Sequence, residues 1–201
     1  MKKYKSIQAL AVIILLVSSS AFSQVKDKIA PLADGATLAE SQDWLVKNIN
    51  KYFGYTGIDD SVKISDLKFD GCRMSYRVLQ TYTDQKTAQG DRPVLGKTGA
   101  KGATDVQYSV YEDIAFDLKD INPSQVGLGA LPKPKAMQLI SLETIDKKDL
   151  INFNRKGTTV QYNASGARAI AAFPVKEKAG EAVALGLRHV VQLCQAPNTA
   201  K

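Results

Sequence analysis

The pattern of hydrophobic and polar positions divides this chain into a helix, a run of strands and a final helix. Hydrophobic side chains between residues 38 and 53 recur at spacings of three, four and seven, which predicts an amphipathic helix. Thr37 and Glu40 have the spacing of a capping box, and Gly54 follows as a helix-ending glycine. The period then changes to two, so β-strands are expected through the middle of the chain.

About six antiparallel strands are expected after this helix. Asp70-Gly71 is a typical two-residue turn and predicts a hairpin between strands at 62–69 and 72–83. Residues 106–118 form either one long strand or two strands broken by a bulge near Glu112-Asp113. Further strands are expected at 136–145, 150–154, 158–163 and 167–173, with a turn at 119–124, a loop at 125–135 and a hairpin turn at 155–157.

The end of the chain again has a helical period. Pro174 fits the first turn of a helix, where its missing N–H costs nothing, so a helix is predicted over roughly 175–195. Small residues beside its apolar stripe would let this helix pack closely. The stripe consists of Val183, Leu187, Val190 and Cys194.

These elements predict an α+β domain. It would contain a bent antiparallel sheet of about six strands, an N-terminal helix and a C-terminal helix that caps the sheet. By element order alone, this arrangement resembles the pleckstrin-homology-like architecture. The stretches FDGCRMSY, IAFDLKDINPSQV and ALGLRHVVQLC also resemble a group of uncharacterised exported bacterial proteins, a resemblance that implies one exported domain and no particular mechanism.

The N-terminus has the features of a secretory signal. Three lysines precede the apolar run from Ala9 to Val17, and Ala21 and Ser23 suit a cleavage site before Gln24. Residues 1–23 are therefore expected to be a signal peptide, 24–36 a lead-in, 37–195 one domain and 196–201 a frayed tail. Losing the three lysines lowers the formal net charge from +7 to +4, which weakens the case for a nucleic-acid partner.

Cys72 and Cys194 are the two cysteines of the chain. Both lie on apolar stripes, one of a strand and one of the final helix, so they should meet where that helix packs on the sheet. An exported protein permits a disulfide between them, and two buried thiols are the alternative.

Residues 84–104 are polar, rich in glycine and lysine, and expected to form a flexible loop. They contain Gly96-Lys97-Thr98, which matches the end of a phosphate-binding loop. The required earlier glycine is displaced to Gly90, and Pro93 removes an N–H from the cradle, so a nucleotide site is not expected.

Other candidate chemistry is sparse. His189 is the single histidine, and a packed or edge position is expected for it rather than a catalytic one. Glu112 and Asp113 are the best carboxylate pair, but neighbours in a strand point to opposite faces. Lys68, Arg73 and Arg77 are expected on a solvated face, and Tyr76 and Tyr82 on the cysteine face, in the core. No catalytic group, cofactor or metal site can be read.

The sequence therefore favours a non-catalytic exported domain that binds or scaffolds an unknown protein of the bacterial cell envelope, in the periplasm or outside the cell. A carrier of a small apolar ligand and an unrecognised envelope hydrolase are the alternatives. Neither nucleic acid nor a membrane span after signal cleavage is expected.

Overall fold

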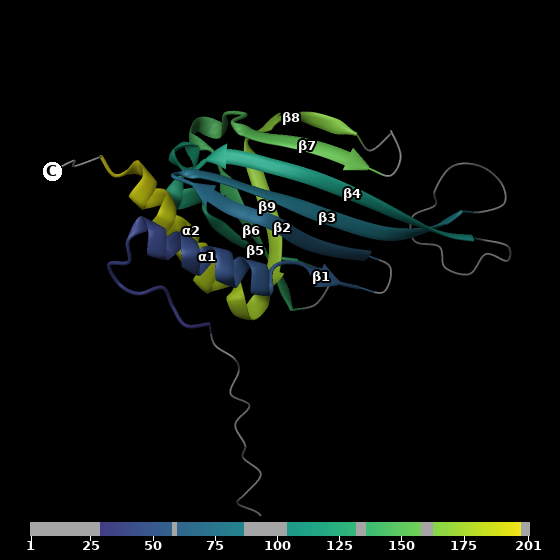
Figure 1. The fold of residues 1–201 in the computed structure, drawn as a ribbon, viewed down its shortest axis with the longest axis horizontal. Coiled ribbons are helices and arrows are strands. Elements are labelled where there is room, and N and C mark those ends of the chain that lie inside the picture. Colours follow the sequence, from purple (N-terminus) through teal and green to yellow (C-terminus); the bar gives the residue numbers. More distant parts are fainter. Residues whose placement is uncertain (1–28, 58–59, 87–103, 132–135, 158–162, 198–201) are drawn as a thin grey trace, which may run out of the picture.

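The computed structural model describes residues 29–57, 60–86, 104–131, 136–157 and 163–197. They form an N-terminal helix, a C-terminal helix, an antiparallel sheet of six strands and a second sheet of three strands (Figure 1). The α+β class and the six-stranded sheet are thus confirmed, and the second sheet is an addition. The expected signal peptide and the phosphate-loop-like stretch at 90–102 lie outside the described residues.

Helix α1 (Leu38–Tyr52) begins at the expected capping box. The Thr37 N–H donates to Glu40 Oε2 at 2.9 Å, and the Glu40 N–H donates to Thr37 Oγ1 at 3.3 Å. These two bonds satisfy backbone donors that the first turn of a helix leaves without partners. Most of the apolar stripe of α1 is buried in the core, and Leu38 packs against it partly buried.

The six-stranded sheet is nearly a meander, in the order β1-β2-β3-β4-β7-β8 with every neighbouring pair antiparallel. The two longest strands, β3 and β4, lie at its centre. The strands are β1 (Tyr55–Thr56), β2 (Asp60–Asp70), β3 (Arg73–Lys86), β4 (Thr104–Asp117), β7 (Ile151–Gly157) and β8 (Ala164–Arg168).

Strand boundaries differ from the sequence prediction at several points, and one expected strand lies mostly outside the described residues. β3 and β4 reach into both ends of the loop expected at 84–104. Residues 155–157 complete β7 instead of forming a hairpin turn, because they pair with Glu112 and its neighbours on β4. Of the strand expected at 158–163, residues 158–162 lie outside the described residues. The strand expected at 167–173 is divided between β8 and β9, which belong to different sheets.

The second sheet contains β5 (Gly127–Ala130), β6 (Met137–Glu143) and β9 (Ile170–Lys176), in the order β5-β6-β9. β5 lies in the segment expected to be a loop. Pro174 lies within β9 rather than opening the last helix, because β9 is an edge strand and an edge tolerates a missing N–H. Helix α2 therefore begins later, at Glu177, and ends at Gln195. Short 3₁₀ turns, η1 (Leu118–Asp120), η2 (Pro123–Gln125) and η3 (Ile145–Lys147), complete the connections.

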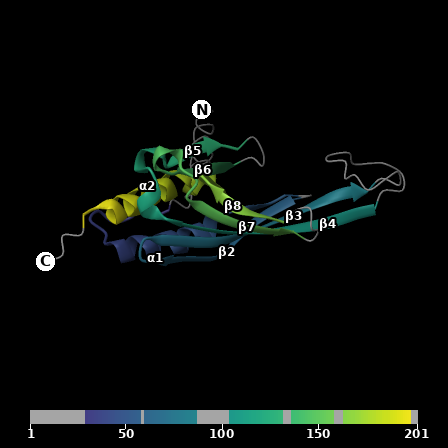
Figure 2. The same cartoon turned by 90° about the horizontal axis from the view of Figure 1, so that it is seen from above.

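The second sheet packs on one face of the six-stranded sheet. In Figure 1, β9 crosses the long strands at a steep angle, and Figure 2 shows the second sheet and α2 on the same side of the large sheet. Aromatic rings fill the junction. The ring of Phe173 on β9 lies 5.9 Å from that of Tyr76 on β3 and 5.5 Å from that of Phe53, measured between centroids. The aromatic junction thus joins both sheets to the end of α1.

The two helices approach each other closely because α2 carries small residues at the contact. A side chain added at Gly186 would come within 2.8 Å of the Trp44 ring and 3.2 Å of Leu45. The apolar stripe expected for α2 is buried throughout, which confirms that prediction. Within the described part of the chain, no helix is long and apolar enough to cross a membrane.

Cys72 and Cys194 meet as the two apolar stripes require. Cys72 lies in the turn between β2 and β3, one residue before β3 begins, and Cys194 lies in the last turn of α2. Their Cα atoms are 5.7 Å apart, and their sulfur atoms are at bonding distance. The expected proximity is therefore confirmed, and the pair would link residues 122 positions apart in the chain.

We predict that the protein purified without reductant contains this disulfide. Titration of the denatured, non-reduced chain should find no free thiol, and two free thiols per chain would contradict the bond. The Cys72→Ala/Cys194→Ala variant should lower the free energy of unfolding by about 4–5 kcal/mol, since the bond closes a long loop in the unfolded chain. Urea denaturation with and without reductant measures the effect, and reductant should leave the variant unchanged.

We predict that Gly54→Ala is strongly destabilising. Gly54 has φ 76°, and its N–H donates to the carbonyl of Pro174 at 2.9 Å. An added Cβ would overlap the backbone carbonyl of Val62, which a side-chain rotation cannot relieve. The free energy of unfolding should fall by about 2–4 kcal/mol.

The matched control for this variant is Gly71→Ala. Gly71 also has a positive φ, of 54°, but an added Cβ would meet no atom within 4 Å. Only backbone strain remains there, about 1 kcal/mol. Equal losses of stability in the two variants, measured by urea denaturation, would show that the close packing at Gly54 is not the cause.

Candidate functional site

The six-stranded sheet has two chemically different faces. Its inner face carries Met74, Tyr76, Ile114 and Phe116, all buried beneath the second sheet and the helices. Its outer face carries the alternate residues of the same strands. Among the described residues these are mostly polar and half-buried or exposed. The outer face is therefore the large polar surface that the fold leaves open.

A shallow trough of about 630 Å³ crosses this outer face. Its floor exists because two small residues, Ser75 on β3 and Ala115 on β4, are paired in register. The rows on either side of the floor are larger and charged, Arg73 with Asp117 on one side and Arg77 with Asp113 on the other. Lys68 on β2 and Asn152 on β7 stand at the two ends of the floor row.

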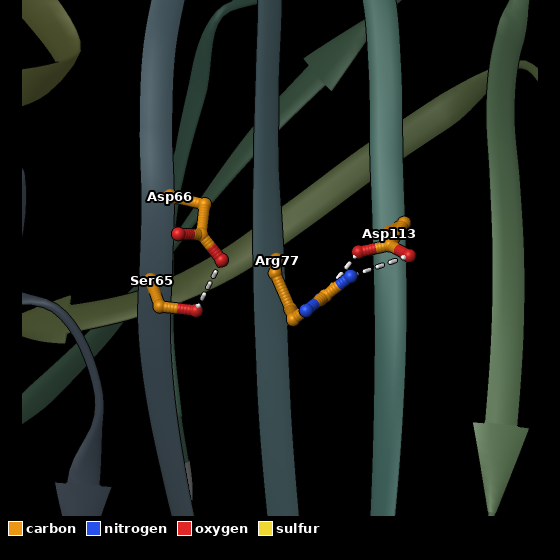
Figure 3. A network of polar contacts seen from close by, with 4 residues as sticks. All are labelled: Ser65, Asp66, Arg77 and Asp113. Carbon is orange, nitrogen blue, oxygen red and sulfur yellow. Dashed lines mark hydrogen bonds and ion pairs between the residues drawn. The ribbon is translucent and has the colours of Figure 1, made fainter.

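Arg77 and Asp113 form a bidentate ion pair along one wall of the trough (Figure 3). Arg77 Nε donates to Asp113 Oδ1 at 2.6 Å, and Arg77 Nη2 donates to Asp113 Oδ2 at 3.1 Å. The hydrogen bond from Arg77 lowers the pKa of the Asp113 carboxyl, and the same bond raises the pKa of the guanidinium. Two parallel bonds fix the orientation of both side chains.

Asp66 adds a second carboxylate to the trough through an irregularity of β2. The β2–β3 register shifts between Ser65 and Lys68, and Asp66 has φ 56°, a conformation that aspartate tolerates better than most residues. Its carboxylate accepts a hydrogen bond from Ser65 Oγ at 3.1 Å (Figure 3). In contrast, the β3–β4 register is unbroken, so the possible bulge near Glu112-Asp113 does not form.

Glu112 lies on the opposite face from Asp113, as strand alternation requires. Its side chain is 14% exposed and accepts hydrogen bonds from Arg155 Nη2 at 3.1 Å and Arg168 Nη1 at 2.8 Å. The guanidinium of Arg168 also lies over the Phe153 ring, 5.2 Å from its centroid. Glu112 and Asp113 are therefore separate ion-pair centres and do not converge on one substrate.

The side chain of Tyr82 lies outside the described part of the structure, and the other predicted residues occupy core or surface positions. Tyr76 is 2% exposed, and burial raises the pKa of its phenol well above the ordinary value, so its ring cannot act as a stacking platform. Arg73 and Lys68 are exposed on the outer face, as expected. His189 is half-buried, with Nε2 3.1 Å from the carbonyl oxygen of Ala36. Among the described residues, no group of three His, Cys, Asp or Glu side chains could hold a metal ion.

Sequence reasoning missed the trough itself. Ser75 and Ala115 are ordinary small residues in the sequence, and only the β3–β4 register pairs them. Alternation along β3 places Ser75 on the arginine face but gives no partner on β4. Asp66 was missed because no local pattern marks the irregularity of β2.

We predict that Glu112→Gln lowers the free energy of unfolding by about 1–3 kcal/mol. The change would leave two guanidinium groups without a counter-charge on a half-buried face. Arg155 and Arg168 keep 42% and 31% exposure, so solvent screening holds the loss below that of a fully buried pair. Urea denaturation at neutral pH measures this.

Asp113→Asn provides the matched control on the outer face, where the partners are nearly half exposed. A smaller loss of stability is expected, and it should depend on pH. Because the folded-state pKa of Asp113 is lowered, its contribution is present above the unfolded pKa of about 4 and disappears as pH falls through the lower folded value. A difference between wild type and Asp113→Asn that persists at low pH would contradict the ion-pair account.

Comparison of the chain with protein-family models, with curated proteins and with solved structures found no match. The resemblance to exported bacterial proteins and to the pleckstrin-homology-like architecture therefore stays a prediction.

Proposed function

We propose that this protein is a non-catalytic exported domain of the bacterial cell envelope that binds a partner protein through the outer face of its six-stranded sheet. The observation that carries this proposal is the trough over β2, β3, β4 and β7. It is open to solvent along its length, and polar side chains from four strands border it. A surface of this form suits an extended polar partner better than an enclosed small molecule.

The charged groups of the trough support a binding role. Arg77 and Asp113 hold each other in place through two hydrogen bonds, so their remaining donor and acceptor positions are already oriented. Less side-chain freedom is then lost when a partner binds. The sheet beneath the trough is anchored by the aromatic junction, which makes it a rigid platform.

Export is supported by two features. The first 23 residues have the positive, apolar and small-residue regions of a cleavable signal. The pair of Cys72 and Cys194 is placed for a disulfide, a bond that persists in the periplasm and outside the cell.

The two alternatives receive less support. An apolar ligand would need space between the sheets, where the rings of Tyr76, Phe116 and Phe173 already pack. A hydrolase built on Glu112 and Asp113 would need both carboxylates on one side of the sheet, and each instead pairs with arginine on its own side.

Site-specific photo-crosslinking in bacterial cells that make the protein tests the proposal. A photoreactive amino acid at Lys68 or Asn152, the exposed ends of the trough floor, should yield a discrete crosslinked species. The same group at Gln192, exposed on α2, is the matched control and should not. Arg77→Ala should reduce the yield from Lys68 and Asn152. Equal crosslinking at all three positions, or none at the trough, would contradict the proposal.

A further inference from the structure

Strand β8 is an open edge of the six-stranded sheet. It pairs with β7 on one side and is the last strand in the sheet order. The four residues Ala164, Ser165, Gly166 and Ala167 are all exposed. Among the described residues, no backbone hydrogen bond connects residues 164–168 to anything beyond β7. The outward N–H and C=O groups of β8 are thus accessible to another strand.

The opposite edge of the same sheet is protected, and β8 is not. β1 is only two residues long, and the rest of β2 carries exposed lysines, Lys63 and Lys68, together with the register shift near Asp66. Short strands, lysines and bulges are the usual devices that prevent unwanted strand pairing. β8 has an unbroken register with β7, and its sequence ASGAR contains neither lysine nor proline.

The side chains of β8 offer little obstruction to an incoming strand. Alanine, serine and glycine leave the backbone uncovered on both faces of the strand. A docked segment would continue the sheet beyond β8 and would satisfy its own backbone groups with those of β8. This is the β-strand addition mode of peptide recognition, in which main-chain hydrogen bonds supply the affinity and neighbouring side chains supply the specificity.

Positive charge surrounds this edge. Arg155, Lys156 and Arg168 lie on β7 and β8, and Glu112 is the acidic partner of the two arginines. Lys156 is exposed, and the nearby Asp113 is paired with Arg77. These three cations are balanced by only one carboxylate, that of Glu112, so this edge of the sheet has an excess of positive charge. A hollow of about 510 Å³ at the start of β8, bordered by Arg155 and Lys156, could receive a carboxylate.

A second copy of this chain fits the edge poorly. Pairing β8 with β8 of another copy would bring the same positive groups together across a two-fold axis. A strand of five residues also offers far less contact than the roughly 1,600 Å² of a stable interface. An acidic segment of another protein avoids the charge repulsion, and a weak, transient complex does not need so large an interface.

We infer that β8 binds an extended acidic peptide segment of a partner protein as an additional antiparallel or parallel strand. The inference does not depend on the trough, because the carrying observations are the open edge and the charges on β7 and β8. It names a second surface, at the side of the sheet, for the binding module proposed above.

Titration of the ¹⁵N-labelled exported protein with an acetylated peptide of about eight alternating valine and glutamate residues tests the inference. The expected result is saturable change in the amide signals of residues 164–168. A peptide of alternating valine and lysine has the same β-propensity and should bind at least about tenfold more weakly. Changes confined to residues 65–77 and 113–115 would place the peptide in the trough and would overturn the inference, as would the absence of any change.

Backbone methylation separates strand addition from simple charge attraction. Two versions of the acidic peptide are compared. One carries backbone N-methyl groups on its valine residues, and the other carries them on its glutamate residues. Only one set of N–H groups points toward β8, so one version should bind normally and the other should lose binding. Equal binding of the two versions would overturn the strand-addition mode.

Charge reversal tests the electrostatic part. Lys156→Glu should weaken binding of the acidic peptide by about fivefold or more and strengthen binding of the lysine peptide. Lys47→Glu, the same change at an exposed lysine on α1, is the matched control and should affect neither peptide. Equal effects of the two variants would show that only net charge matters and would overturn the assignment to β8.

Discussion

Contact between Phe173 and the large sheet determines how the rest of the molecule is arranged. Its ring packs against Tyr76 on one side and Phe53 on the other, so one residue joins both sheets to the end of α1. β9 can reach this position because it pairs with β6 and because the carbonyl of Pro174 accepts the N–H of Gly54. With the inner face occupied in this way, the polar residues of the long strands are left on the outside.

Sequence patterns that act over a few neighbouring residues correctly predicted the start of α1 and the hairpin between β2 and β3. The capping box at Thr37 and the β2–β3 hairpin act within a few residues, and both are present, although the two turn residues are Gly71-Cys72 rather than Asp70-Gly71 because Asp70 pairs with Arg73. The position of Pro174 was predicted wrongly, because proline occurs both in the first turn of a helix and in an edge strand. Only the pairing of β9 with β6 distinguishes the two positions. β5, with the sequence GLGA, has no hydrophobic period and becomes a strand through pairing with β6.

The candidate site was predictable only in part, for a related reason. Alternation alone placed Glu112 and Asp113 on opposite faces, and the stripes of β3 and α2 placed the two cysteines together. A surface feature that spans four strands depends instead on how each strand is aligned with the next. The alignment of β2 changes at Asp66, where a positive φ is set by the surrounding sheet and leaves no mark in the sequence.

The two central strands extend well beyond the body of the domain (Figure 1). β3 and β4 remain paired as far as Lys86 and Thr104, whereas the pairing of β2 with β3 stops at Tyr82 and that of β7 with β4 at Val110. Within the part of the chain that the structure describes, the outer part is therefore a two-stranded ribbon with no further strand paired beside it. Inserting or deleting two residues in each strand would change its reach by about 7 Å while every side chain kept its face. Evolution can thus adjust the length of this arm without any compensating change in the core.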